Sequence, residues 1–300
     1  MESEFLSWIK SRLPASPHVL VGPGDDAAVL QGTETDIVVT TDLLCDGVHF
    51  RVGQDPSCRI GRKAIAVNLS DLAAMAAMPV AAFVAVALPR DGSDLAKEIT
   101  EGMLGLADEF DMALAGGDTN TWEGPLVISV TLIGRSPPQG PLLRTGAQVG
   151  DHLLVTGQFG GSRLGRQFEF QPRVSEARLL YERFQLHAGI DCSDGLSLDS
   201  WRLAEASDCG VLLDLEAIPI APAARKLADS DSTPPLDHAL GDGEDFELIL
   251  AVPADDAAKM LAEQPLDVPI TKIGTFVEQR GLWNDGPEGQ VEMKPQGYQH

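Results

Sequence analysis

The sequence contains few basic residues and few cysteines. Lys and Arg number 22 against 45 Asp and Glu, which gives a formal net charge of −23 over 300 residues. This small number of Lys and Arg side chains cannot neutralise a nucleic-acid backbone or bind an anionic lipid surface. We therefore expect neither a nucleic-acid partner nor a membrane partner. The four cysteines show no C-x-x-C spacing, which argues against a zinc site or a disulfide framework and predicts a cytoplasmic location.

A secretory signal and a transmembrane run are not expected either. The N-terminus reads MESEFLSWIKSRL, in which Phe5, Ile9 and Leu13 follow the spacing of an amphipathic helix and no basic stretch precedes an apolar one. The uncharged run 72–88 is shorter than the ~20 residues of a transmembrane helix. Because Pro79 divides this run, we expect a buried helix followed by a buried strand.

The common glycine-based motifs for phosphate binding and nucleophilic catalysis are missing. The sequence contains no G-x-x-x-x-G-K-[ST] loop and no G-x-S-x-G elbow. Gly22-Pro-Gly24-Asp25-Asp26-Ala27 matches a dinucleotide fingerprint, but its carboxylates would repel a pyrophosphate and the expected next element is a strand. No covalent nucleophile or general base stands out, so phosphate handling would depend on metal ions.

A mixed α/β fold in two domains is expected from the length and the order of elements. Three hundred residues exceed the usual single domain, and the Pro- and Gly-rich stretch 136–141 is the strongest break in the chain. We therefore predict domains over 1–137 and 138–300, each with strands and helices. The expected strands are 27–30, 36–41, 80–88, 112–115, 126–135, 152–156, 188–191, 211–215, 246–252 and 269–276, and the expected helices are 56–78, 94–110, 175–186, 196–207 and 255–263, with a turn at Gly116-Gly117.

Acidic residues are concentrated beside glycines and at the ends of apolar strands. In open α/β sheets ligands bind in the crevice at strand ends, so this pattern predicts a polar site. The alternative is that Asp beside Gly forms ordinary turns and that Asp194 caps a helix. The segments are Gly24-Asp25-Asp26-Ala27, Thr40-Thr41-Asp42, Gly116-Gly117-Asp118-Thr119, Asp191-Cys192-Ser193-Asp194-Gly195 and Gly241-Asp242-Gly243-Glu244-Asp245.

Asp71 has the most unusual position of these acids. It takes the place of an apolar residue in a helical series that runs over 60–78. A carboxylate buried there needs a cation, because an unpaired buried charge is costly or takes up a proton. A Lys or Arg partner is one explanation, but Arg62 and Lys63 lie two turns away and are expected to face elsewhere. We therefore favour a metal ion.

Converging carboxylates predict a site for a hard cation, Mg²⁺ before Ca²⁺ or Mn²⁺. The segment that starts at Asp191 is not an EF-hand loop, because it lacks Gly at the sixth place and Glu at the twelfth. Carboxylate-bound Mg²⁺ commonly serves phosphates, so the pattern indicates phosphoryl transfer. His49 and Arg144 are candidate ligand contacts. An ordinary surface position explains His49 equally well, and a loop Arg such as Arg144 is more commonly solvated.

Six motifs follow one another along most of the chain: GDDAAVL (24–30), TTDLLCDGVHF (40–50), KAIAVNLSDLAAMAAMP (63–79), GGDT (116–119), DCSDGLSLD (191–199) and GEDFEL (243–248). Each motif is weak alone, but the ordered set is highly specific. Together they resemble the thiamine-monophosphate kinase family, which belongs to the superfamily of aminoimidazole-ribonucleotide synthetase and selenophosphate synthetase.

The resemblance implies a fold and a reaction. The fold would be like that of aminoimidazole-ribonucleotide synthetase: an N-terminal sheet domain (1–137) that binds metal and ATP and pairs in a homodimer, and a C-terminal α/β domain (138–300) that completes the ATP and substrate site. The reaction would convert ATP and thiamine monophosphate into ADP and thiamine diphosphate, with several Mg²⁺ ions. Transfer would be direct and in line, and no general base is needed because the acceptor phosphate is already anionic.

The resemblance also implies residue roles, carried over position by position. Metal ligands would be Asp26, Asp42, Asp71, Asp118, Asp191 and Asp194, with Thr40 and Thr41 assisting. Residues in contact with ATP would be Gly117, Asp118, Arg144 and Ser193, and residues in contact with thiamine monophosphate would be His49 and Glu244.

Three departures from the family pattern concern the substrate side. Asp242 stands in the left flank of the Gly-Gly-Glu-Asp motif, and the segment 161–191 is short and lacks the His-Leu-x-Pro-x-Pro-Arg pattern. An aromatic residue expected near the C-terminus falls on or near Pro295, with Tyr298 as a substitute. The alternative functions are a sister ATP-dependent enzyme of the cyclo-ligase or selenophosphate synthetase type, and a non-catalytic acidic protein that binds divalent metal or phosphate.

Overall fold

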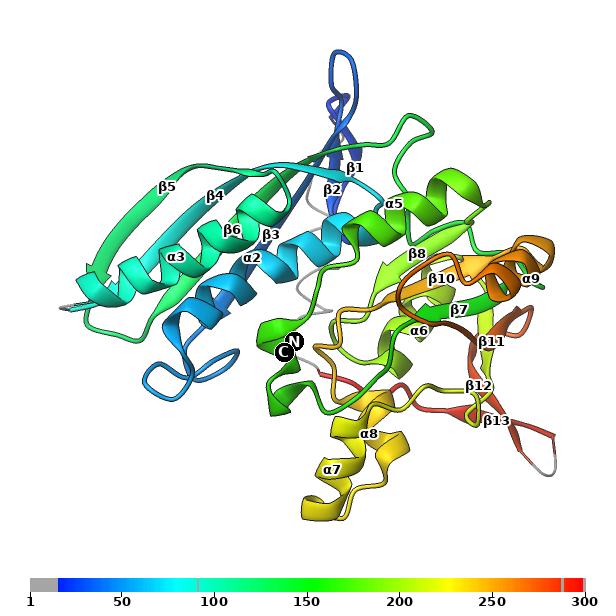
Figure 1. The fold of residues 1–300 in the computed structure, drawn as a ribbon. Coiled ribbons are helices and arrows are strands. Elements are labelled where there is room, and N and C mark those ends of the chain that lie inside the picture. The colour runs from blue at the N-terminus through cyan, green and yellow to red at the C-terminus, as the bar shows by residue number, and fades with distance from the viewer. Residues whose placement is uncertain (1–15, 91, 287–288, 299–300) are drawn as a thin grey trace.

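The computed structural model describes residues 16–90, 92–286 and 289–298, and Figure 1 shows them as two β-sheets with helices packed against both. This is the mixed α/β architecture expected from the sequence, with one sheet built by each half of the chain. The predicted helix with Phe5, Ile9 and Leu13 lies outside the described residues. In the described part of the chain, no helix is both long and apolar enough to cross a membrane.

The N-terminal half forms a six-stranded sheet in the order β1-β2-β3-β6-β4-β5, antiparallel except for the β4–β5 pair. Its strands are β1 (Val19–Val21), β2 (Ala28–Leu30), β3 (Ile37–Cys45), β4 (Met78–Pro89), β5 (Ala113–Trp122) and β6 (Val127–Arg135). Two long helices, α2 (Ser57–Ala74) and α3 (Ser93–Glu109), pack side by side against one face of the sheet (Figure 1). Alternate residues of β6 are buried beneath these helices, and no helix of the described residues covers the other face.

The C-terminal half forms a seven-stranded sheet in the order β13-β12-β9-β11-β7-β10-β8. Its strands are β7 (His152–Thr156), β8 (Ala188–Asp191), β9 (Gly210–Leu213), β10 (Leu248–Val252), β11 (Ile270–Val277), β12 (Gly281–Gly286) and β13 (Gly289–Met293). The helical segments are η1 (Ser162–Leu164), α4 (Arg166–Glu169), α5 (Val174–Arg183), α6 (Leu196–Ala206), α7 (Pro222–Asp231), α8 (Pro235–Gly241) and α9 (Ala254–Glu263).

Helix α2 packs against both halves of the chain. Its Ile60 belongs to the same apolar core as Leu154 and Leu250 of the C-terminal sheet. The alternate residues of those strands, Leu153 and Ile249, belong to a second core that α6 completes. The C-terminal strands are therefore buried on both faces, which explains why β10 reads as the continuous apolar run LILAV rather than as an alternating pattern.

Two expectations about element boundaries are wrong. The turn expected at Gly116-Gly117 lies inside β5, and a Cβ on Gly117 would stand 1.8 Å from the carbonyl oxygen of Val84 on β4. Glycine therefore permits close approach of two strands here rather than a reversal of the chain. The helix expected over 56–78 ends before Ala76, whose left-handed φ of 53° cannot continue a helix.

Candidate active site between the two sheets

A cleft of about 1250 Å³ lies between the two halves of the chain. Its N-terminal side comes from the loop before β2, from β3 and from α2, and its C-terminal side comes from the segments that follow β8 and α8. The fold thus collects at one place many of the residues to which the sequence assigned a role. Those that line the cleft are Asp26, Thr40, Thr41, Asp42, His49, Asp71, Arg144, Asp191, Ser193, Asp194 and Glu244.

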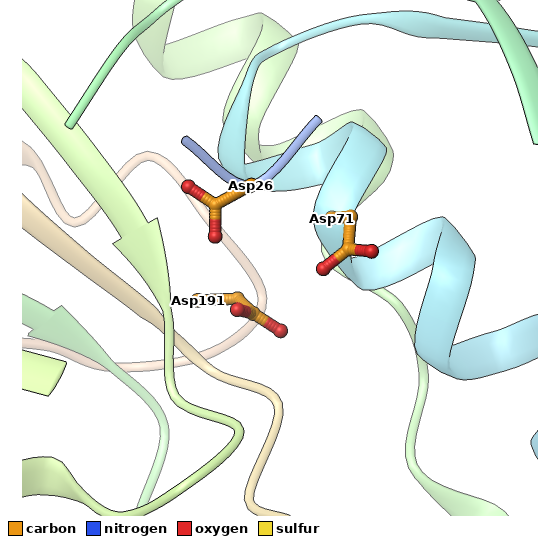
Figure 2. Close-up of side chains that lie close together, drawn as sticks. All are labelled: Asp26, Asp71 and Asp191. Atoms are coloured by element: carbon orange, nitrogen blue, oxygen red, sulfur yellow. The ribbon is translucent and has the colours of Figure 1, made fainter. Parts of the chain in front are cut away.

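Three carboxylates come together in this cleft. Asp26 lies in the loop before β2, Asp71 on α2 and Asp191 at the end of β8, and Figure 2 shows their side chains gathered around one space. One oxygen of each lies within 4.8 Å of the others. Hydroxyl groups fix two of them, because Thr40 Oγ1 donates to Asp71 Oδ2 and Ser70 Oγ donates to Asp191 Oδ2 at 2.5 Å. The carboxylates are therefore oriented by the protein itself.

Burial and mutual repulsion raise the pKa values of these acids. Burial raises the pKa of Asp71 well above its ordinary value, and the charges of Asp42, Asp191 and Asp26 raise it further. Burial also raises the pKa of Asp191, with Asp26 as the next cause. The pKa of Asp42 is raised to about 6 by burial and by the charge of Asp194. A cation bound among these groups would relieve both effects.

Two arginines neutralise part of the negative charge. Arg144 donates from Nε to Asp26 Oδ2 at 2.9 Å and from Nη2 to Asp26 Oδ1 at 2.8 Å. Arg202 donates from Nη1 to Asp194 Oδ2 at 2.5 Å. Of the cleft carboxylates to which the sequence assigned a role, Asp42, Asp71 and Asp191 accept no hydrogen bond from a Lys or Arg side chain in the described part of the chain. An all-oxygen donor set with this surplus of negative charge fits a hard divalent cation such as Mg²⁺.

The basic residues on α2 do not pair with Asp71. Arg62 Nη2 donates to the carbonyl oxygen of Phe170 at 2.7 Å, and Lys63 Nζ donates to Glu244 Oε1 at 2.6 Å. Arg62 therefore faces elsewhere, as expected, whereas Lys63 lines the same cleft as Asp71 but pairs with Glu244. This leaves a cation other than lysine or arginine as the natural counter-charge of Asp71.

The side chain of Asp194 does not cap α6. The N-cap residue of this helix is Gly195, and no side chain caps it from that position. Asp199, in the first turn, instead accepts hydrogen bonds from the backbone N–H groups of Asp194 at 2.9 Å and Gly195 at 3.1 Å. The Asp194 carboxylate is thus left to line the cleft, where Arg202 holds it.

The cleft also holds His49, Glu244 and a residue that our sequence analysis did not assign to the site, Lys63. The Lys63 side chain is 0% exposed, and its ammonium forms an ion pair with Glu244 at 2.6 Å. A signal for its burial does exist in the sequence. Lys63 follows Ile60 by three residues and precedes Val67 by four, so it lies on the apolar stripe of α2.

Gly117 and Asp118 do not line the cleft of their own chain. Both lie on β5, an edge strand of the N-terminal sheet, and Asp118 is exposed. Asp118 pairs with Ala85 on β4, Ala85 pairs with Ser129 on β6, and Ser129 pairs with Leu43 on β3. Leu43 is the neighbour of Asp42 in the sequence. Three strand spacings of about 4.8 Å put the backbone of Asp118 about 14 Å from that of Leu43. Within one chain, Asp118 is therefore apart from the acidic cluster.

Asp118 and Thr41 share the face of the sheet that has no helix. Residues paired directly across a sheet point to the same side, so Asp118 shares its face with Leu43 and with Thr41, two positions earlier on β3. The Thr41 hydroxyl donates to the carbonyl oxygen of Val130 at 3.1 Å on this side. Two of the predicted ligands thus project from the open face and not toward α2.

Three of the residues that line the cleft are aromatic: Trp201 on α6, Phe246 before β10 and Tyr298 near the C-terminus. The backbone N–H of Tyr298 donates to the carbonyl oxygen of Asp194 at 2.8 Å, which ties the C-terminal segment to the acidic cluster. Pro295 is not among the residues that line the cleft. In the described part of the C-terminal segment, Tyr298 is therefore the aromatic residue that can meet a ligand.

Comparisons with known proteins agree with this arrangement. The chain matches the family AIR synthase related protein, N-terminal domain, over residues 24–136 and the family AIR synthase related protein, C-terminal domain, over residues 144–282. It is 44% identical over 310 residues to the thiamine-monophosphate kinase of Rhodopirellula baltica, an alignment that covers 100% of this chain and 97% of the relative. It is 34% identical over 308 residues to that of Escherichia coli K12, which covers 94% and 92% of the two chains.

A solved structure, AaThiL complexed with AMPPCP and TMP, has the same fold. It superposes on this chain with a TM-score of 0.87 at 26% identity, over 100% of this chain and 96% of that one. The similarity therefore extends over both sheets and over the cleft between them.

Proposed function

The chain belongs to the thiamine-monophosphate kinase family of the AIR synthase related proteins, and we propose that the cleft between its two sheets is the place of the reaction. The reaction is the ATP-dependent phosphorylation of thiamine monophosphate to thiamine diphosphate. The proposal for the cleft rests above all on the meeting of Asp26, Asp71 and Asp191, which come from three separate motifs of the sequence.

Several Mg²⁺ ions are proposed to bind the acidic part of the cleft. Asp26, Asp71 and Asp191 would share one of them, since their oxygens already surround one space. Further ions would take Asp42 and Asp194 as ligands, with Thr40 at the edge of the set. When bound, Mg²⁺ would neutralise the negative charge that develops during phosphoryl transfer.

The protein's own contribution to the chemistry would be positioning. The acceptor is a phosphate monoester that carries negative charge near neutral pH, so no residue has to remove a proton from it. Arg144 and Ser193 would hold the phosphates of ATP, and Gly117 and Asp118 would also contact the nucleotide. Holding donor and acceptor in line lowers the entropic part of the barrier.

The substrate is proposed to bind beside His49 and Glu244. The Glu244 carboxylate can pair with the cationic thiazolium ring or accept a hydrogen bond from the aminopyrimidine. His49 Nδ1 accepts a hydrogen bond from the backbone N–H of Cys45 at 3.0 Å, which fixes the ring and places the proton of the neutral form on Nε2. Tyr298 would offer an aromatic face to the same ligand.

A homodimer that covers the helix-free face of the N-terminal sheet is proposed. Ile37, Leu43 and Phe83 expose 36%, 57% and 42% of their surface on β3 and β4, and their side chains share this face. Apolar side chains gathered on a sheet face mark an interaction surface. Asp118 and Thr41 project from the same face, so a second copy packed here would place both residues at the interface.

We also propose that the chain divides into domains over 1–137 and 138–300, and that the protein is located in the cytoplasm. The first is supported by the Pro-rich stretch 136–141 between the two sheets, the second by four cysteines that remain free thiols.

ADP release with different acceptor substrates distinguishes the proposed kinase activity from the activities of the related ATP-dependent enzymes. The purified chain is incubated with ATP and Mg²⁺ and with one candidate acceptor at a time: thiamine monophosphate, thiamine or formylglycinamidine ribonucleotide. We expect ADP with thiamine monophosphate only. ADP with the ribonucleotide instead would assign the chain to a cyclo-ligase activity.

A further inference from the structure

We propose that Lys63 is a positioning residue for the thiamine monophosphate site, which it serves by holding the Glu244 carboxylate and the His49 main chain in place. This inference rests on the proposed function and extends it to a residue outside the substrate-binding pair. Lys63 belongs to α2 in the N-terminal half, whereas Glu244 belongs to the segment before β10. The contact therefore also joins the two walls of the cleft.

The hydrogen bonds of the Lys63 ammonium show that it acts through other residues. Lys63 Nζ donates to Glu244 Oε1 at 2.6 Å, to Gln167 Oε1 at 2.6 Å and to the carbonyl oxygen of His49 at 2.8 Å. A lysine ammonium has three N–H donors, so these acceptors use all of them. No donor remains for a substrate phosphate, and a direct contact with the phosphate would require one of these bonds to break.

The Glu244 carboxylate is held at one oxygen only. Its Oε1 accepts from Lys63, whereas Oε2 accepts no hydrogen bond from the residues that the structure describes. The Glu244 side chain is 31% exposed and lines the cleft, so Oε2 can meet a ligand while Oε1 stays fixed.

The backbone at Glu244 is strained into the position that allows this contact. Glu244 has a left-handed φ of 55°, and its N–H donates to the carbonyl oxygen of Ser193 at 2.7 Å. The preceding Gly243, with φ of 71°, passes so close that a Cβ there would lie 2.7 Å from the same oxygen. Residues in such conformations persist only where surrounding contacts hold them, and they gather at functional sites.

The surroundings of Lys63 come from the segment that departs from the family pattern. Gln167 supplies one acceptor, and the ring of Phe168 lies 5.2 Å from the ammonium, within cation–π distance. Burial lowers the pKa of Lys63, and the charge of Glu244 opposes that shift. Residues of the short segment 161–191 thus surround the Lys63 ammonium, and Glu244 is the carboxylate with which it forms an ion pair.

Steady-state kinetics of Lys63→Met, Glu244→Gln and the double variant test the inference. Losing one charged hydrogen bond weakens binding by about 10- to 100-fold. We expect Lys63→Met to raise the KM for thiamine monophosphate by that factor and to leave the KM for ATP within about twofold. The double variant should be no worse than Glu244→Gln alone, because Lys63 acts through Glu244.

Arg62→Met is the matched control, because Arg62 is the neighbouring base on α2 and bonds only main-chain and Gln171 oxygens of the 168–171 segment. It should lower Tm without changing the KM for thiamine monophosphate. Lys63→Gln, which keeps a donor of similar length without the charge, serves if the methionine variant does not fold. It should show the same selective rise in KM.

Three results would overturn the inference. One is an unchanged KM for thiamine monophosphate in the Lys63 variants, and another is a double variant whose losses multiply. The third is an equal rise in KM for both substrates, which would make Lys63 a general structural residue. A wild-type chain without activity toward thiamine monophosphate would refute the proposed function itself, and the wild-type assay run in parallel separates that case.

Discussion

The Arg144 guanidinium holds both carboxylate oxygens of Asp26, at 2.9 Å from Nε and 2.8 Å from Nη2. The Asp26 side chain is 0% exposed and that of Arg144 is 22% exposed, so the pair is largely withdrawn from water. The backbone N–H of Arg144 also donates to Asp25 Oδ2 at 3.1 Å. One arginine of the C-terminal half thus neutralises the loop that carries a predicted metal ligand.

Removal of Arg144 should destabilise the metal-free protein. Arg144→Met leaves the buried Asp26 carboxylate beside Asp71 and Asp191 without its counter-charge, and breaking a buried pair in this way costs about 3 kcal/mol. We expect urea unfolding to show a loss of that size without metal and a smaller loss with Mg²⁺, because the ion would take over the neutralisation. Arg280→Met is the control, since its pair with Asp208 is 73% and 83% exposed and is worth at most ~1 kcal/mol. An Arg144 variant whose stability loss is the same with and without Mg²⁺ would contradict a metal at Asp26.

Asp71→Asn should abolish most turnover and leave the fold intact. The amide keeps the shape of the side chain and its contact with Thr40 but removes the charge that a cation requires, so we expect kcat to fall by about 100-fold or more. The metal-free protein should be as stable as the wild type or more stable, because repulsion with Asp42 and Asp191 is relieved. Asp94→Asn, at a side chain that is 92% exposed, is the matched control. Near-normal turnover of Asp71→Asn at saturating Mg²⁺ would remove Asp71 from the site.

Asp118 provides a test of the dimer. Asp118→Asn should be inactive on its own, although this residue lies apart from the acidic cluster of its chain. If Asp118 serves the partner's cleft, a mixed dimer with Asp71→Asn contains one complete site. Random mixing of equal amounts would restore about a quarter of the wild-type activity, because half of the dimers are mixed and each has one good site of two. No recovery after mixing, with dimers shown by light scattering, would mean that Asp118 does not act across the interface.

His238 should make stability depend on pH. It is 3% exposed, and its ring nitrogens meet Asp242 at 2.9 Å and Asp231 at 3.2 Å. Burial lowers its pKa, but the two carboxylates outweigh burial and raise the pKa above its ordinary 6.5. The stabilisation is therefore complete below about pH 6.5 and is lost as pH rises through the folded pKa. The stability difference between wild type and His238→Gln should be larger at pH 6 than at pH 8.5 in urea unfolding. Equal differences at the two pH values would exclude a charged His238.

The parts of the fold that the sequence predicts best are those with long or continuous apolar patterns. Strands β7 and β8 have the predicted bounds, α6 and α9 differ from their predicted ranges by one residue at one end, and α3 differs by one residue at each end. The helices α4 and α8 were not predicted, because they are 4 and 7 residues long and show too few turns for a periodic pattern. Helix α7 is as long as α9 but was also missed, because its sequence PAARKLADSD contains a single large apolar residue, Leu227. The hairpin of β12 and β13 was also missed, since its strands are mostly polar.

The candidate site was predictable where one segment carries its own signal. Asp71 interrupts an apolar helix, and Asp191 stands beside Ser193, Asp194 and Gly195 at the end of an apolar strand, so each could be singled out from local sequence alone. The pairing of Lys63 with Glu244 could not, because the two residues are 181 positions apart and meet only when the two halves of the chain pack together.

The most direct measurement is an end-point assay with ATP, Mg²⁺ and thiamine monophosphate, in which the products are separated by chromatography. We expect ADP and thiamine diphosphate in equal amounts, and neither product when Mg²⁺ is withheld. Intact ATP after incubation with a folded chain that binds Mg²⁺ would contradict it.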